Sequence, residues 1–119
     1  MINKELGNKG EQIAARHLIK NNYEIIERNW RTGRLEVDII AKKKNEIIFV
    51  EVKTRNTSYY GFPENAVNWK KKKFLYSAAN SYIFRKNIKL DVRFDIISII
   101  IEKGTFELEH IEDAFFPMF

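Results

Sequence analysis

Asp38, Glu51 and Lys53 are the residues of this chain whose types and positions best fit a metal site. They belong to two segments, 35–41 and 46–53, in which apolar and polar residues alternate. Such alternation predicts two β-strands that each bury one face. Because residues two apart on a strand share a face, Glu51 and Lys53 are expected to point the same way.

The length of the connection between these strands predicts how they pair. If residues 44–45 form a two-residue hairpin, Asp38 faces Glu51 directly on the neighbouring strand. The same register places Glu36 opposite Lys53, where an ion pair is the favoured role for Glu36. A different hairpin length would break both pairings.

Two facing carboxylates repel each other, and a bound cation would offset that repulsion. Their Cβ atoms would lie roughly 5 Å apart, and at an effective dielectric of about 20 the charges repel by roughly 3 kcal/mol. An ion pair with a nearby exposed lysine stabilises the fold by only about 0–1 kcal/mol. A divalent cation between the oxygens reverses the sign, and hard oxygen ligands suit Mg²⁺ or Mn²⁺ better than zinc.

Two expected helices each aim one charged residue towards the sheet. In the first helix, Glu11 lies at the margin of the apolar stripe that contains Ala14 and Leu18. In the second, Lys71 lies near the centre of the buried stripe, whereas its lysine neighbours lie to the sides or the back. That stripe consists of Val67, Phe74, Leu75, Ala78 and Tyr82.

The order of elements predicts a mixed α/β fold. Pro63 is expected at the first position of the second helix, where its missing N–H costs nothing. A helix before three consecutive strands, then a crossover helix into further strands, implies a mixed sheet flanked by helices. One domain over residues 1–119 is predicted, with a helix over 4–20, strands over 23–31, 35–41 and 46–53, a helix over 63–85, and strands over 88–101 and 105–111.

Composition narrows the class of protein. The 119 residues are 45% hydrophobic and 13% aromatic and include no cysteine, which suits a globular domain and excludes disulfides and thiolate chemistry. The net charge of +5 favours a polyanionic partner. No signal-like or membrane-spanning apolar run is found, so a cytoplasmic protein without a membrane partner is expected.

Several motifs, taken in order, carry a family resemblance. Asp38, a gap of twelve residues and Glu51-Val52-Lys53 resemble the PD-(D/E)xK signature of restriction-type nucleases. The chain as a whole resembles the small YraN-like family of uncharacterised, endonuclease-like bacterial proteins, although that family usually has Gly where Leu35 stands. The segments that match are 7–11, 28–31, 36–41, 49–55, 66–67 with Lys71, 93–95, 110–111 and 114–115.

The resemblance implies a restriction-endonuclease-like fold and a role for each site residue. Asp38 and Glu51 would hold Mg²⁺ or Mn²⁺, and Glu11 would bind the metal or a water on it. Lys71 would contact the scissile phosphate. Lys53 would orient water or stabilise charge rather than act as a base, because a lysine beside two carboxylates tends to stay protonated.

Residues around this cluster have alternative interpretations. Arg55 either binds a phosphate through its guanidinium or pairs with a nearby acid. Tyr59 and Tyr60 are candidates for substrate contact, since they lie in the loop that follows Lys53. His17 and His110 are far apart in the sequence and lack ligand spacing, so structural roles are favoured for both.

The resemblance and the charge together predict a metal-dependent nuclease that hydrolyses phosphodiester bonds in DNA, including branched DNA, or in RNA. The alternative is a non-catalytic module that binds nucleic acid or protein and keeps a vestigial site. A homodimer would suit a branched substrate, with the apolar segment 114–119 as a candidate surface. Packing of that segment within its own domain is an equal alternative.

Overall fold

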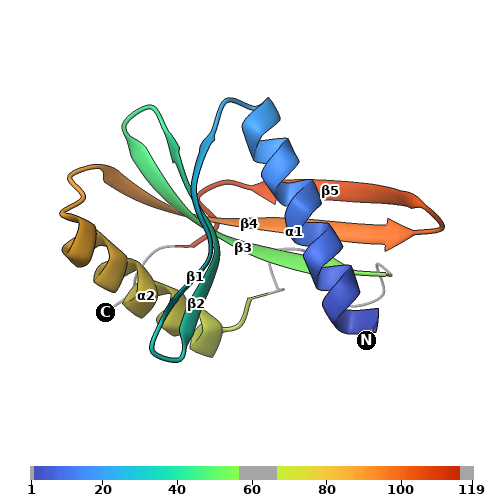
Figure 1. Ribbon diagram of the computed structural model, residues 1–119, viewed down its shortest axis with the longest axis horizontal. Helices are drawn as coiled ribbons and strands as arrows, with labels where there is room; N and C mark the ends of the chain where they lie inside the picture. The colour runs from blue at the N-terminus through green and yellow to red at the C-terminus, as the bar shows by residue number, and fades with distance from the viewer. Residues whose placement is uncertain (1, 57–66, 116–119) are drawn as a thin grey trace.

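The order of helices and strands follows the order expected from the sequence. The structure, a computed structural model, describes residues 2–56 and 67–115 (Figure 1). Its elements are α1 (Ile2–Lys20), β1 (Glu24–Thr32), β2 (Leu35–Lys43), β3 (Glu46–Arg55), α2 (Trp69–Lys86), β4 (Asp91–Glu102) and β5 (Thr105–Ile111).

The five strands form one mixed sheet in the order β1-β2-β3-β4-β5. The pairs β1–β2, β2–β3 and β4–β5 are antiparallel, while β3 and β4 are parallel. A parallel pair needs a crossover connection, and α2 lies within it. The mixed sheet flanked by helices that the sequence predicts is therefore confirmed.

The two helices cover opposite faces of the sheet (Figure 1). Strand β3 shows this by alternation, because Ile47 and Phe49 belong to the core that contains α2 residues, whereas Ile48 and Val50 belong to the core that contains α1 residues. Such alternation follows from the two-residue period of a strand. The sheet is thus buried on both faces at its centre, and any polar group there needs a partner.

The hairpin between β2 and β3 has the predicted register. Lys44 adopts the left-handed conformation that such a turn requires, with φ of 54°. The backbone pairs run from Lys43↔Glu46 to Ile39↔Val50. The ladder ends there, so the predicted backbone pairing of Asp38 with Glu51, and of Glu36 with Lys53, lies beyond its last pair.

Helix α2 begins later than predicted. Its first residue is Trp69, and the side chain of Asn68 caps it by accepting a hydrogen bond of 2.9 Å from the Lys71 N–H. Pro63, predicted to begin this helix, lies outside the described residues. The Asn68 cap defines the start of the helix, and it therefore also places Lys71 in the first turn.

The buried face of α2 differs from the predicted stripe at three positions, since Phe74 is exposed and Tyr76 and Ala79 are buried. Phe74, predicted to be buried, is 45% exposed. The residues of α2 that are buried are Leu75, Tyr76, Ala78, Ala79 and Tyr82. Neither α1 nor α2, the helices of the described part of the chain, is long and apolar enough to cross a membrane.

Helix α1 approaches β3 closely at a glycine. A Cβ atom on Gly10 would overlap Thr54 Oγ1 and lie 2.8 Å from Thr54 Cβ. Only a residue without a side chain allows α1 to sit this near the end of β3 that follows Glu51. The same approach sets the distance from Glu11 to the sheet.

Replacing Gly10 by alanine is expected to push α1 away from β3. The clash with Thr54 should lower the free energy of unfolding by about 1–3 kcal/mol, measured by urea denaturation. Gly7 is the matched control, because nothing lies within 4 Å of a Cβ placed there. Gly7→Ala should stabilise the helix by about 0.5–1 kcal/mol, so equal effects of the two substitutions would contradict the close packing.

Candidate active site

Two acidic residues are buried at the end of the β2–β3 ladder. Asp38 on β2 is 9% exposed and Glu51 on β3 is 8% exposed. The predicted encounter of these two carboxyl groups is present through their side chains, since a hydrogen bond between them perturbs the pKa of each and the charge of Asp38 also raises the pKa of Glu51. The two residues come from adjacent strands of the same hairpin, which makes their meeting a direct result of its register.

The Asp38 carboxylate accepts a backbone hydrogen bond in place of a backbone carbonyl. One oxygen of its carboxylate, Oδ2, accepts a hydrogen bond of 2.8 Å from the Val52 N–H. Val52 lies just past the last backbone pair of the β2–β3 ladder, where its N–H would otherwise lack a partner in the interior. This bond fixes the orientation of the Asp38 carboxylate relative to β3.

Glu51 is the less satisfied of the two acids. Its Oε2 lies 3.4 Å from Lys71 Nζ, an ion pair whose lysine side chain is 42% exposed. Its Oε1 is buried and has no hydrogen-bond partner in the part of the chain that the structure describes. Lys71 was predicted to point towards the sheet from the centre of its helix stripe, and its contact with Glu51 confirms that direction.

Burial raises the pKa of both acids. Burial, followed by the charge of Asp38, raises the pKa of Glu51 from its ordinary value near 4.5 to about 8, although Lys71 opposes the rise. Burial also raises the pKa of Asp38, opposed by the bond from Val52 and by a hydrogen bond from Glu51. At neutral pH the pair therefore holds a proton, carried by Glu51 and shared with Asp38.

Glu11 and Lys53 lie at the periphery of this pair. Glu11 is half-buried, and burial together with the charge of Asp38 raises its pKa. Among residues 2–56 and 67–115, no three carboxylate or imidazole side chains are grouped to hold a metal ion. Lys53 is exposed on β3, two residues beyond Glu51. The metal role of Glu11 and the water- or phosphate-orienting role of Lys53 stay predictions.

Glu36 has a different partner from the one predicted. Its Oε2 lies 2.7 Å from Arg31 Nε, and the two residues are paired across β1 and β2. Lys53 was expected to be the partner of Glu36. The β2–β3 ladder ends before these two residues, and Arg31 on β1 is the cation that pairs with Glu36 instead. Glu36 is thus held on the β1 side, away from the Glu51–Lys71 ion pair.

Arg55 is buried instead of being presented to solvent. It is 9% exposed, its Nη2 lies 3.5 Å from Ser98 Oγ, and its Nε has no hydrogen-bond partner among the described residues. The side chain is therefore held against β4, and its predicted contact with substrate phosphate stays a prediction. Tyr59 and Tyr60, the other two predicted substrate contacts, lie outside the described residues.

Sequence reasoning missed a second polar cluster, which lies on the sheet beside α1. Asp95 of β4 is fully buried, and its Oδ2 lies 2.8 Å from Arg93 Nη2 and 2.7 Å from His110 Nε2. His110 Nδ1 in turn lies 3.0 Å from His17 Nε2 of α1. Arg93 Nη2 also donates to the Tyr23 hydroxyl at 2.6 Å. The structural roles favoured for His17 and His110 agree with this placement.

The proton positions in this chain of contacts follow from the charge of Asp95. Burial by itself would raise the pKa of Asp95, but hydrogen bonds from His110, Arg93 and the Asp113 N–H outweigh it and lower the pKa. An ionised Asp95 accepts from Nε2–H of His110. The Nδ1 atom of His110 is then free to accept from Nε2–H of His17.

The only sequence signal for this cluster was an acid within an apolar strand. Asp95 stands between Phe94 and Ile96 in a segment that is otherwise buried, and a buried acid needs a partner. Its cation, Arg93, lies two residues earlier on the same strand face. The histidines could not be found in this way, since 93 residues separate them.

The fold and the site define a mixed α/β domain with a pair of buried, interacting carboxylates beside a lysine. The chain belongs to the uncharacterised protein family UPF0102, whose model matches residues 10–99. It is 45% identical to a UPF0102 protein of Phocaeicola vulgatus over 113 residues, which cover 95% of this chain and 93% of that protein. A UPF0102 protein of Bacteroides thetaiotaomicron is 46% identical with the same coverage, and one of Christiangramia forsetii is 47% identical over 94% of each chain.

The buried carboxylate pair should make stability fall as pH rises. Glu51 binds its proton more tightly in the folded protein than in the unfolded chain, so the folded state loses stability between pH 4.5 and about 8. The loss amounts to about 1.4 kcal/mol for each unit of pKa difference. Thermal melts in the absence of metal, recorded across this pH range, should show that the melting temperature falls less with rising pH in Glu51→Gln than in the wild-type protein.

Glu107→Gln is the control for this measurement, because Glu107 is exposed on β5. Its melting temperature should follow that of the wild-type protein at every pH. A Glu51→Gln variant that kept the full slope would contradict the protonated pair.

The buried Asp95 should be a structural requirement of the fold. Asp95→Asn leaves Arg93 and His110 without their buried anion, which should lower the free energy of unfolding by about 3 kcal/mol or more. Because the folded-state pKa of Asp95 is lowered, its contribution is present above the unfolded value and is lost as pH falls through the folded one. The difference between variant and wild type should therefore shrink in acid.

Glu112, which also contacts Arg93, provides the comparison for Asp95. Glu112 contacts Arg93 Nη1 at 3.3 Å with a side chain that is 60% exposed. Glu112→Gln should change stability by less than about 1 kcal/mol. Equal losses from the two substitutions would show that burial of Asp95 does not matter.

Proposed function

We propose that this chain is a metal-dependent nuclease that hydrolyses phosphodiester bonds in DNA, with a site of the PD-(D/E)xK kind. The observation that carries the proposal is the buried pair of carboxyl groups, Asp38 and Glu51, with a lysine against it. The motifs shared with the YraN-like, endonuclease-like proteins and the net charge of +5 support it.

The residues present fit a hard divalent cation. Within residues 2–56 and 67–115, Glu51 Oε1 is buried without a hydrogen-bond partner, which costs free energy in an interior unless a cation or proton meets it. Burial and then the charge of Asp38 raise the pKa of Glu51, and a divalent cation between the two carboxylates would oppose both effects. Carboxylate oxygens are the donors that Mg²⁺ and Mn²⁺ prefer.

Each residue of the site has a role that its position allows. Asp38 and Glu51 would hold the cation, and Glu11, in the field of Asp38, would bind it directly or through water. When bound, Mg²⁺ or Mn²⁺ lowers the pKa of water and neutralises charge on a phosphate. The Val52 N–H keeps the Asp38 carboxylate oriented throughout.

The two lysines would act on the substrate. Lys71 is 42% exposed although it touches Glu51, so its ammonium group is able to turn outward to a phosphate oxygen. Lys53 is exposed on β3, next along the same strand. There it would orient the attacking water or stabilise the negative charge that develops on phosphorus oxygens.

The proposal predicts cleavage that depends on both metal and Asp38. Purified protein is incubated with duplex, single-stranded and branched DNA in Mg²⁺, in Mn²⁺ and in EDTA. Cleavage is expected only with metal. Asp38→Asn should reduce the rate by about 100-fold or more, because even residues that only support a metal ligand typically contribute about 10–100-fold.

Glu36→Gln is the matched control, since Glu36 is a carboxylate two residues away that pairs with Arg31. It should cleave at close to the wild-type rate. Equal cleavage by wild type and Asp38→Asn would identify a contaminating nuclease. No cleavage of any substrate, with no rise of melting temperature on addition of Mn²⁺, would favour a non-catalytic binding module instead.

A further inference from the structure

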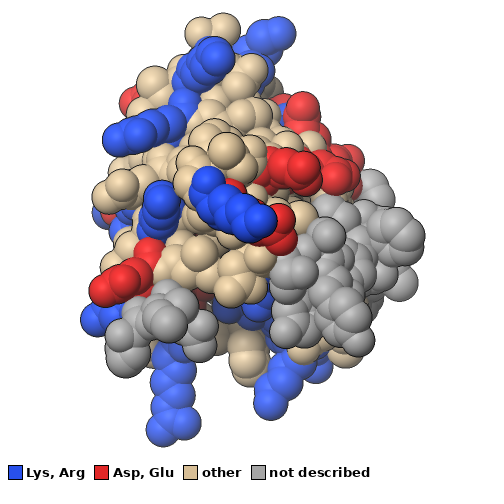
Figure 2. All heavy atoms as spheres, turned by 90° about the vertical axis from the view of Figure 1, so that its right-hand side faces the viewer, with Lys and Arg blue, Asp and Glu red and all other residues tan. Residues whose placement is uncertain are grey.

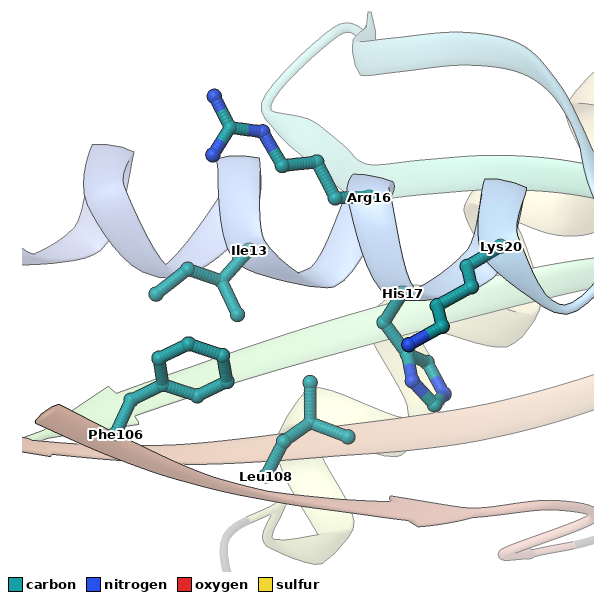
Figure 3. Close-up of a pocket in the computed structure, with 6 residues that line it drawn as sticks. All are labelled: Ile13, Arg16, His17, Lys20, Phe106 and Leu108. Carbon is teal, nitrogen blue, oxygen red and sulfur yellow. The ribbon is translucent and has the colours of Figure 1, made fainter.

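A pocket separate from the carboxylate pair lies between α1 and β5. It has a volume of about 350 Å³, within the size range of small-ligand sites. Figure 3 shows side chains from α1 above it and from β5 below it. The residues that line it are Ile13, Arg16, His17, Lys20, Phe106 and Leu108.

The interior of this pocket is apolar and includes an aromatic ring open to solvent. Ile13 and Leu108 pack against the core beneath α1, and their side chains face each other across the pocket (Figure 3). Phe106 is 53% exposed at its edge. A large exposed ring at the rim of an apolar pocket is a surface on which a flat group can stack.

The pocket is basic at its rim and has no carboxylate among its lining residues. Arg16 and Lys20 are exposed on α1, and the amine of Lys20 lies towards the His17 ring (Figure 3). The acids of β5, Glu107 and Glu109, line the opposite side of the sheet with Ser98. The face turned to the right in Figure 1 carries one group of acidic side chains at its upper right, and further acidic side chains lie at its centre and lower left (Figure 2).

His17 forms a fixed end wall of the pocket. Its ring is held by the contact with His110, which is itself held by the buried Asp95. Burial, then the neighbouring His110 and Lys20, lower the pKa of His17, so the ring is neutral at pH 7. A flat group entering between Phe106 and His17 therefore meets two aromatic rings, of which His17 is preorganised.

We propose that this pocket binds one nucleotide of single-stranded nucleic acid, with the base against Phe106 and the phosphate at Lys20. An apolar pocket with a stacking ring suits a base of any sequence, and a cationic rim suits its phosphate. The pocket opens on the α1 side of the sheet, opposite the Glu51–Lys71 pair on the α2 side. Binding here does not depend on cleavage at the carboxylate pair.

The test separates stacking from simple charge attraction. Fluorescence anisotropy in EDTA measures binding of oligo(dT) of about ten nucleotides and of an abasic strand of the same length. Phe106→Leu keeps an apolar side chain but removes the ring. It should weaken binding of oligo(dT) by about 10-fold, as expected for one lost stacking contact, and leave binding of the abasic strand unchanged.

Two further variants control the measurement. Phe84→Ala removes a ring that is 87% exposed on α2, far from the pocket, and should bind both strands as the wild type does. Lys20→Gln should weaken the binding of both strands. It should also reduce the slope of the logarithm of affinity against the logarithm of salt concentration by about 0.7. Melting temperatures of all variants establish that each is folded.

Three results would overturn the proposal. One is equal affinity of wild type and Phe106→Leu for oligo(dT). Another is equal affinity of the wild type for oligo(dT) and the abasic strand, which would show charge attraction alone. The third is displacement of oligo(dT) by an acidic peptide with aromatic residues that binds more tightly and also depends on Phe106, which would identify a protein as the occupant.

Discussion

Two carboxylates buried side by side, Asp38 and Glu51, constrain the structure around them. Removing them from water and placing them together is unfavourable, so neighbouring elements are arranged to offset it. The β2–β3 ladder ends early and gives the Val52 N–H to Asp38. The Asn68 cap fixes the first turn of α2, from which Lys71 reaches Glu51. Among the described residues, one buried oxygen of Glu51 is left without a hydrogen-bond partner.

A second buried acid in the same sheet shows how a purely structural site differs. Asp95 is as deeply buried, yet both of its oxygens receive hydrogen bonds, from Arg93, His110 and the Asp113 N–H. Its pKa is lowered, whereas that of Glu51 is raised. Complete hydrogen bonding stabilises the ionised form of a buried acid, whereas burial of an incompletely paired acid raises its pKa.

The sequence predicts what depends on short-range periodicity and fails where long-range packing decides. The register of β2 and β3 was predictable because side chains alternate with a period of two and the hairpin is two residues long. The end of that ladder at Ile39 was not, since it depends on the carboxylate of Asp38 replacing a backbone acceptor. The start of α2 was misplaced because proline and asparagine both signal a helix start. His17 and His110 meet only through the crossover that places β4 and β5 beside β3.

That crossover also has a kinetic consequence. Strands β1, β2 and β3 pair with their neighbours along the chain, whereas β3 pairs with β4 only after residues 56–90 have closed a loop. Closing a loop loses chain entropy before any contact is gained, so such pairing is slow to form. During synthesis the far edge of β3 stays open until β4 emerges. The strand that carries Glu51 is then the segment most vulnerable to pairing with another nascent chain.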